Sequence, residues 1–252
     1  MYSLLASLSL LNIRLITAIL FISFNTYAAE SILVVTEYLA PYQIKNEDNS
    51  LGGVSTDVVK ALFKETNDEF DIKLMPWARA YKTALTKKDT LIYSILRTPA
   101  REKLFHWIGA IKSERIYIWA LKSSHFDKIN TIDQLNTKRI GLVRNSYAEK
   151  FIQNKKFTKI DLLVNDDQNI RMLFKHRIDL IIGDALTLAP RAKKYNLDFS
   201  QIEPLFEVKP LSVNLYIAFN LNSDPKLVRR YQQAFKKLEK SGKIKAILKN
   251  IN

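Results

Sequence analysis

Residues 75–81 read Met-Pro-Trp-Ala-Arg-Ala-Tyr, residues 91–96 read Leu-Ile-Tyr-Ser-Ile-Leu, and residues 97–107 read Arg-Thr-Pro-Ala-Arg-Glu-Lys-Leu-Phe-His-Trp. The middle piece is a short apolar run with β-branched and aromatic residues, which predicts a buried strand. We expect a helix to begin near Trp77 and a turn to follow the strand at Thr98-Pro99. Proline fits that turn because it presets φ and cannot donate to a strand ladder.

This turn lies just past the carboxyl end of the predicted strand, which is where open α/β sheets bind ligands. Arg97 and Arg101 stand four residues apart on it. Two guanidinium groups at this spacing could form a fork-shaped trap for a carboxylate. The alternative is that both arginines are solvated surface residues, and this stretch alone does not decide between them.

The composition limits the chemistry that the chain can perform. The 252 residues carry 39 Lys and Arg against 25 Asp and Glu, and there is no cysteine. Disulfides, thiolate metal sites, thiol nucleophiles and lipid-attachment cysteines are therefore excluded. The three histidines show no metal-ligand spacing, so we expect no metal and no cofactor. We interpret the excess positive charge as mostly a solvated face that assists the capture of anions.

The first 28 residues differ from the rest. Two apolar runs surround Arg14, and Thr26-Tyr27-Ala28 places small residues at the −3 and −1 positions of a cleavage site. This pattern predicts a secretory signal peptide cut after Ala28. The rival interpretation, an uncleaved membrane anchor, would put Arg14 in mid-membrane. We therefore expect export to the periplasm, which argues against a nucleic-acid partner.

Strand and helix patterns alternate along the remainder, which predicts an α/β fold with mostly parallel sheets. The expected strands cover residues 31–36, 70–74, 91–96, 116–121, 139–143, 160–164, 178–182 and 213–219. The expected helices begin at a cap among residues 55–57, at Trp77, at residues 131, 166, 184, 225 and 243, and at the loop 144–147, which opens a helix through Phe151. The pattern falls into two similar halves of about 90 residues each, a usual domain size.

Six short motifs in this order resemble one family. They are residues 40–42 (Ala-Pro-Tyr), 53–57 (Gly-Val-Ser-Thr-Asp), 98–101 (Thr-Pro-Ala-Arg), 139–143 (Arg-Ile-Gly-Leu-Val), 178–184 (Ile-Asp-Leu-Ile-Ile-Gly-Asp) and 238–242 (Leu-Glu-Lys-Ser-Gly). Residues 31–251 are similar to the bacterial extracellular solute-binding proteins of family 3, the polar amino-acid type.

That resemblance implies a two-lobed periplasmic binding protein type II fold, with mixed, mostly parallel sheets, a hinge and a central cleft. The chain would cross between lobes near residues 112–116 and 209–213. Lobe 1 would then comprise residues 29–113 and 212–252, and lobe 2 residues 114–211.

The resemblance also implies a function. The protein would capture a small amino acid-like or carboxylate solute and deliver it, as a monomer, to an inner-membrane ABC permease. Two alternatives stay open: a cyclic-acid dehydratase-like enzyme on the same fold, and a ligand sensor that signals to a membrane receptor. An enzyme needs a positioned acid or base. Only Glu37 and His106 are candidates, and neither lies in a catalytic motif, so we expect no turnover.

Carried over from the family, Arg101 would bind the α-carboxylate of the ligand, with Thr98 beside it in the motif. Ser146, together with backbone N–H groups at a helix start, would bind the carboxylate from the second lobe. Asp184 would bind the α-ammonium group. The competing interpretation of Asp184 is a helix cap, the frequent role of an aspartate in that position.

Further residues complete the predicted site. Glu37 could face the pocket as a second cation partner or pair with Arg97. Trp77 could cover the ligand or pack in the core. Tyr42 and Tyr147 could line the cleft or be core aromatics with a solvated hydroxyl.

Four residues depart from the family pattern. Leu39 stands where an aromatic residue is expected, Leu96 replaces a serine, Arg97 is an additional charge where an apolar residue is common, and Asn145 replaces a glycine. These departures count against a standard basic or neutral amino acid as the ligand.

Overall fold

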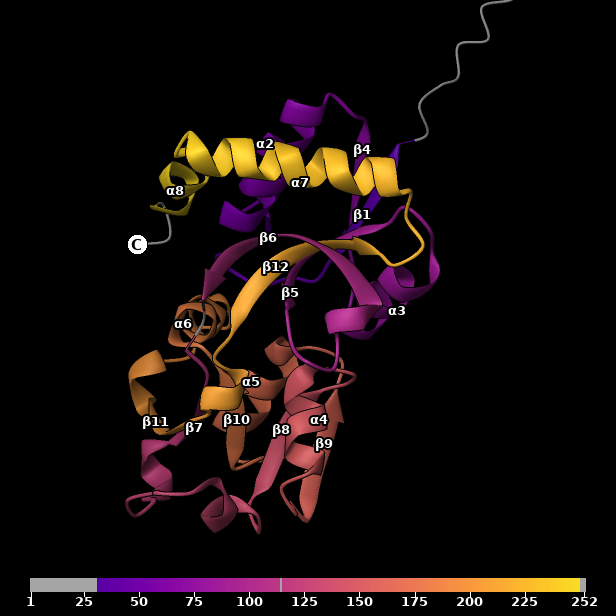
Figure 1. Ribbon diagram of the computed structural model, residues 1–252. Coiled ribbons are helices and arrows are strands. Elements are labelled where there is room, and N and C mark those ends of the chain that lie inside the picture. The colour runs from indigo at the N-terminus through magenta and orange to yellow at the C-terminus, as the bar shows by residue number, and fades with distance from the viewer. Residues whose placement is uncertain (1–30, 114, 250–252) are drawn as a thin grey trace, which may run out of the picture. The chain divides into compact units, whose positions relative to one another are not determined.

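The computed structural model describes residues 31–113 and 115–249 (Figure 1). The expectations for the first 28 residues, a cleaved signal peptide or an anchor, lie outside these ranges. Within them, no helix is both long and apolar enough to cross a membrane. The described chain forms two five-stranded sheets, each covered by helices.

The first sheet has the order β4-β1-β5-β12-β6. Its strands are β4 (Phe70–Leu74), β1 (Ile32–Thr36), β5 (Leu91–Leu96), β12 (Asn214–Asn220) and β6 (Phe105–Ser113). β1 runs parallel to β4 and β5, whereas β12 pairs antiparallel with β5 and β6. β1 and β5 are apolar along their length because helices bury both faces of the sheet.

Helices α2 (Val54–Thr66), α7 (Pro225–Lys240) and α8 (Lys243–Leu248) share one apolar cluster with this sheet. In Figure 1, α7 crosses above β6 and β12. Helix α3 (Trp77–Thr86) packs in a separate cluster with buried side chains of β1, β5, β6 and β12. A short hairpin of β2 (Ile44–Lys45) and β3 (Leu51–Gly52) precedes α2. We call these elements the first lobe.

The second sheet has the order β11-β7-β10-β8-β9. Its strands are β11 (Ile202–Glu207), β7 (Tyr117–Leu121), β10 (Leu180–Gly183), β8 (Arg139–Val143) and β9 (Lys159–Leu163). Two clusters cover its faces, one with α4 (Tyr147–Gln153) and the other with α5 (Asp166–Phe174) and α6 (Ala185–Lys194). We call these elements the second lobe. Short 3₁₀ turns lie at Glu102–Leu104, Lys122–Ser124, Ile132–Leu135, Phe199–Gln201 and Lys209–Leu211.

The chain passes between the sheets twice, after β6 and after β11. The Ile116 N–H donates to Ser212 Oγ at 2.9 Å, so the two crossing segments are joined side by side. The predicted two-lobed α/β fold with mixed sheets is confirmed. The sheets are not mostly parallel as expected, because each contains two parallel and two antiparallel strand pairs. The exact lobe boundaries stay predictions.

The predicted cap of α2 is wrong. The helix begins at Val54 and its N-cap is Gly53, at φ 94°, with no side-chain cap. The backbone N–H of Ser55 donates to Tyr42 O at 2.8 Å, and that of Thr56 to the same oxygen at 3.3 Å. These carbonyl bonds replace a side-chain cap at the start of the helix.

Besides the short strands β2 and β3, two strands of the five-stranded sheets, β6 and β11, were not predicted from the sequence. Within β6 the buried apolar residues Phe105, Ile108 and Ile111 recur every third position instead of every second. The ladder with β12 shifts register at two places, which resets the alternation. β11 contains Pro204 and a register shift before Phe206, so its pattern is also broken.

Candidate functional site

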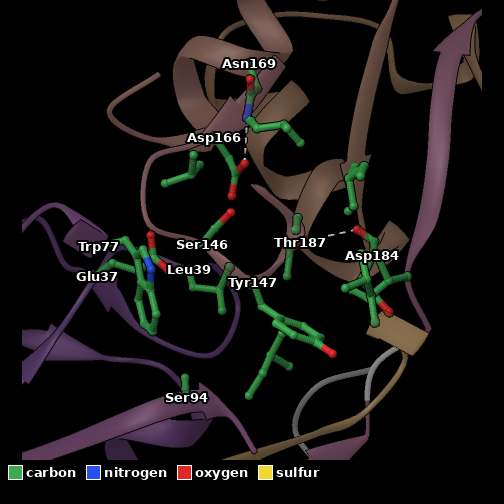
Figure 2. A pocket seen from close by; sticks show the side chains of 18 of the residues that line it. Glu37, Leu39, Trp77, Ser94, Ser146, Tyr147, Asp166, Asn169, Asp184 and Thr187 are labelled. Carbon is green, nitrogen blue, oxygen red and sulfur yellow. Dashed lines mark hydrogen bonds between the residues drawn. The ribbon is translucent and has the colours of Figure 1, made fainter. Parts of the chain in front are cut away.

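A cleft of about 820 Å³, counting its space open to solvent, is lined by residues of both lobes (Figure 2). The first lobe contributes the segment after β1, the end of β5 and the start of α3. The second lobe contributes β8 and β10, with the starts of α4, α5 and α6. Six residues predicted from the sequence line this cleft: Glu37, Trp77, Arg101, Ser146, Tyr147 and Asp184.

Arg101 is the most constrained charged residue of the cleft. Its side chain is buried, and Nη1 donates to the carbonyl of Leu96 at 3.3 Å. The guanidinium carbon lies 5.1 Å from the ring centroid of Trp77, 4.8 Å from that of Tyr81 and 6.0 Å from that of Tyr147. Aromatic faces attract a cation but accept few hydrogen bonds. The arrangement therefore holds the charge without neutralising it.

Burial lowers the pKa of Arg101, since desolvation disfavours the charged form, while the charge of Glu37 opposes that shift. The group nevertheless stays protonated, as arginine does throughout proteins. Nη2 is buried without a hydrogen-bond partner among the described residues. Burying a charged donor without an acceptor is unfavourable. A planar carboxylate is the acceptor that fits the edge of a guanidinium group.

Trp77 joins the two lobes above this arginine. It stacks on Tyr81 with ring centroids 5.4 Å apart, and its indole N–H donates to the carbonyl of Asn145 at 3.0 Å. Asn145 adopts the left-handed conformation, with φ 59°, which an asparagine tolerates better than most residues. Trp77 is thus both a lining residue and a contact between the lobes.

Ser146 caps helix α4. Its hydroxyl oxygen accepts from the backbone N–H of Glu149 at 3.0 Å, while the Glu149 carboxylate accepts from the N–H of Asn145. The hydroxyl proton of Ser146 can still be donated to a ligand. Ser146 also lines the cleft.

Asp184 has the helix-cap role that was one of its two predictions from the sequence. It is the N-cap of α6, where Oδ1 accepts from the N–H of Leu186 at 2.7 Å. Its Oδ2 accepts from the N–H of Arg115, in the first crossing segment, at 3.0 Å. Asp184 also lines the cleft and is buried. Each carboxylate oxygen has a second acceptor site, so the cap does not prevent binding of an ammonium group.

A further carboxylate, Asp166 at the start of α5, was not recognised in the sequence. Figure 2 shows its carboxylate beside Ser146, opposite Glu37 and Trp77. Asn169 Nδ2 donates to Asp166 Oδ1 at 2.9 Å. No sequence signal distinguishes Asp166 from an ordinary first-turn aspartate. Only the placement of α5 beside β8 brings it to the cleft.

Three predicted site residues lie elsewhere. Arg97 donates through Nε and Nη2 to the two oxygens of Glu102, at 2.9 and 2.6 Å. Its guanidinium also packs between Trp107 and Tyr216, at 5.3 and 5.1 Å from the ring centroids. Because Arg97 does not line the cleft, the predicted two-arginine trap is wrong. The carboxylate of Glu102 raises the pKa of Arg97 and occupies its donors.

Tyr42 and Thr98 are buried but do not line the cleft. Tyr42 belongs to the apolar cluster under α2, and its carbonyl oxygen accepts the N–H groups at the start of that helix. Thr98 accepts the N–H of Arg101 on its backbone carbonyl at 2.9 Å, so it shapes the turn that carries the arginine. Among residues 31–113 and 115–249, no cluster of three or more His, Cys, Asp and Glu could bind a metal ion.

Comparisons with known proteins agree with this architecture. The family model described as "Bacterial extracellular solute-binding proteins, family 3" matches residues 32–251. An arginine-binding periplasmic protein of Mannheimia haemolytica is 24% identical over 224 residues, which are 88% of this chain and 91% of that protein.

Two solved structures show the same fold. One is a histidine kinase sensor domain with similarity to periplasmic binding proteins, with a TM-score of 0.77 and 13% identity, covering 88% of this chain and 95% of that one. The other is an ancestral arginine-binding protein bound to arginine, with a TM-score of 0.76 and 19% identity, covering 87% and 97%.

Proposed function

The chain belongs to the bacterial extracellular solute-binding proteins of family 3, and on that premise we propose that it binds an L-amino acid between its lobes. The ligand carboxylate pairs with Arg101 and Ser146, and its ammonium group with Asp184. Trp77 covers the ligand from the first lobe and Tyr147 from the second. Binding is the whole of the activity: the protein captures and releases its ligand without changing it.

The observation that carries the proposal is the buried guanidinium of Arg101. Its Nη2 lacks an acceptor among the described residues, although burying a charged donor without one is unfavourable. Asp184, across the cleft, presents the opposite charge from the other lobe. A zwitterionic amino acid supplies one group for each, so a single small ligand favours contact between the lobes.

The side chain of the ligand would face the acidic part of the cleft. Glu37 and Asp166 line it, and Figure 2 shows them near Ser146 and Trp77. This charge favours a cationic side chain, in line with the names of the arginine-binding relatives. The sequence departures at Leu39, Leu96 and Asn145 had counted against a standard amino acid. The acidic groups outweigh them, because they provide a direct partner for a basic side chain.

Export and delivery complete the proposed role. The protein would work in the periplasm, after removal of its signal peptide, and hand the ligand as a monomer to an ABC permease of the inner membrane. The sensor-domain neighbour supports one second candidate, in which the closed form signals to a membrane receptor. Deleting the permease genes of the host should abolish uptake in the first case and leave the ligand response intact in the second.

The test is calorimetry of the purified chain with L-arginine and two derivatives, each lacking one group. Agmatine lacks the carboxylate, and 5-guanidinopentanoic acid lacks the ammonium. L-arginine should bind, and each derivative should bind at least 30-fold more weakly, because a buried charge of the protein loses its partner. Equal binding of L-arginine and agmatine would contradict the role of Arg101. Consumption of prephenate or arogenate, abolished by Glu37→Gln, would favour the dehydratase alternative.

A further inference from the structure

Helix α6 of the second lobe reaches the segment that follows β1 in the first lobe. Arg191 Nη2 donates to the carbonyl of Tyr38 at 3.4 Å. One turn further along, Lys194 Nζ lies 4.3 Å from the centroid of the Tyr38 ring. Neither Arg191 nor Lys194 lines the cleft, but both neighbours of Tyr38 in the chain, Glu37 and Leu39, do.

An ion cluster around Asp167 fixes the two cations on α6. Arg191, only 2% exposed, donates from Nε to Asp167 Oδ1 at 2.9 Å. Lys194 and the hydroxyl of Tyr195 donate to Asp167 Oδ2 at 2.8 and 2.6 Å. Asp167 already restricts the rotamers of Arg191 and Lys194. Their contacts with Tyr38 therefore cost little additional side-chain entropy.

We propose that Arg191 and Lys194 are positioning residues that latch the segment 37–39 onto the second lobe. We call these two residues and Tyr38 the α6 latch. The segment carries Glu37 and Leu39, so the latch sets where these two side chains stand over the ligand. This proposal rests on the proposed function in one respect: a ligand binds in the cleft.

The latch acts on the equilibrium between open and closed forms. Tyr38 follows a strand of the first sheet, and α6 follows a strand of the second. Their contacts exist only when the lobes meet, and they involve no ligand atom. The latch therefore stabilises the closed form with or without ligand, and it slows ligand release although neither Arg191 nor Lys194 lines the cleft.

The chain offers a matched pair of variants. Lys194→Met keeps the length of the side chain and removes its charge from the Tyr38 ring. Lys193→Met makes the same change one residue earlier, at an exposed position outside these contacts. Because the chain has no cysteine, Lys64→Cys on α2 and Lys150→Cys on α4, both exposed, give two clean sites for fluorescent labels, one in each lobe.

Single-molecule energy transfer between the labels measures the closed fraction, and stopped flow with L-arginine measures release. Lys194→Met should lower the ratio of closed to open molecules two- to fivefold, as expected for an exposed cation–π contact, and raise the release rate by a similar factor. Lys193→Met should match the parent. On a Tyr38→Leu background, which removes the ring, Lys194→Met should have a smaller effect.

The outcomes separate this proposal from the proposed function. A Lys194→Met protein that matches Lys193→Met, or a parent that never closes, overturns the latch. An undiminished effect of Lys194→Met on the Tyr38→Leu background also overturns it, because the effect then comes from Asp167 alone. A parent that closes by itself but ignores L-arginine contradicts the ligand proposed above, while the comparison without ligand still decides the latch.

Discussion

The guanidinium group of Arg101 is held by neighbouring side chains, but one of its nitrogen atoms, Nη2, has no hydrogen-bond acceptor among the described residues. Trp77, Tyr81 and Tyr147 surround its guanidinium, and the Leu96 carbonyl accepts one of its hydrogen bonds. These contacts offset part of the cost of burying the charge, since cation–π contacts contribute about 2 kcal/mol or more when desolvated. Nη2 lacks an acceptor among the described residues, so substitution of Arg101 should affect binding more than folding.

We expect Arg101→Ala to weaken L-arginine binding by about 30-fold or more, because loss of one partner of a buried charge pair costs roughly 2–5 kcal/mol. Arg101→Lys should also bind poorly, since an ammonium group cannot reproduce the bidentate fork. Calorimetry measures both, with circular dichroism as the folding control. Arg97→Ala is the matched control on the same turn, because Arg97 lies outside the cleft lining. Unchanged binding by Arg101→Ala would refute the assignment.

Asp184 should separate binding from stability when two substitutions are compared. Asn is as good an N-cap as Asp, whereas Ala lacks the accepting oxygen and costs typically about 1 kcal/mol. Asp184→Asn should therefore lose L-arginine binding but keep the helix cap; because its amide nitrogen cannot accept the Arg115 N–H, its urea midpoint should lie between those of the parent and Asp184→Ala. Asp184→Ala should lose both. If Asp184→Asn retains full affinity, the residue serves only as the cap that the structure shows.

At the scale of elements, β6 depends on a close approach by α7. A Cβ atom added at Gly109 would lie 2.1 Å from the ring of Phe235, which is fully buried between helix and sheet. Gly109→Ala should destabilise the protein by about 1–3 kcal/mol or more through overpacking. Urea unfolding measures the loss, with ligand-free protein so that binding does not contribute.

Substitution of Gly242 should destabilise the protein through backbone strain, whereas substitution of Gly109 should do so through a steric clash. It joins α7 to α8 at φ 73°, and nothing lies within 4 Å of an added Cβ. Gly242→Ala should cost roughly 1 kcal/mol from left-handed backbone strain alone. Adding Phe235→Leu should rescue Gly109→Ala in part and should not rescue Gly242→Ala. A Gly109→Ala protein as stable as the parent would mean that α7 can move away from β6 freely.

The elements that the sequence predicted well are those whose pattern is local. β1, β5 and β8 are continuous apolar runs because both faces of their sheets are covered, and α7 shows its caps and its apolar face in the sequence. β6 could not be recognised, because its bulges are set by pairing with β12, about 100 residues later in the chain. Gly53 as the cap of α2 likewise depends on carbonyls that the preceding loop brings to the helix.

At the scale of the whole molecule, the Asp167 cluster connects stability to pH. Burial tends to raise the pKa of Asp167, but hydrogen bonds from Lys194 and Tyr195 outweigh it, so the pKa lies below the ordinary value of 3.8. A depressed pKa means that the contribution is fully present above the ordinary value and is lost as the pH falls through the lower folded value. The free energy of unfolding should therefore decline below about pH 4.

Asp167→Asn tests this assignment. The variant should be less stable than the parent at pH 7, and the difference between the two should shrink as the pH falls toward 2, since the parent then loses its charged partner as well. Urea unfolding at pH 7, 4 and 2.5 gives the comparison. If the difference in the free energy of unfolding between parent and variant stays constant across this pH range, the charge of Asp167 does not contribute to stability.

By itself, the sequence determined the fold class and the family resemblance, and it predicted six residues that line the cleft: Arg101, Asp184, Ser146, Tyr147, Trp77 and Glu37. The fold class follows from hydrophobic periodicity and the resemblance from short motifs, which are properties of neighbouring residues. Tertiary structure alone decided that Arg97 turns to Glu102, that Asp166 enters the cleft, and that α6 meets Tyr38. The physical reason is that the attraction between two charges depends on the distance between them, and folding sets that distance. Residues far apart in the chain become neighbours only when the sheets have formed.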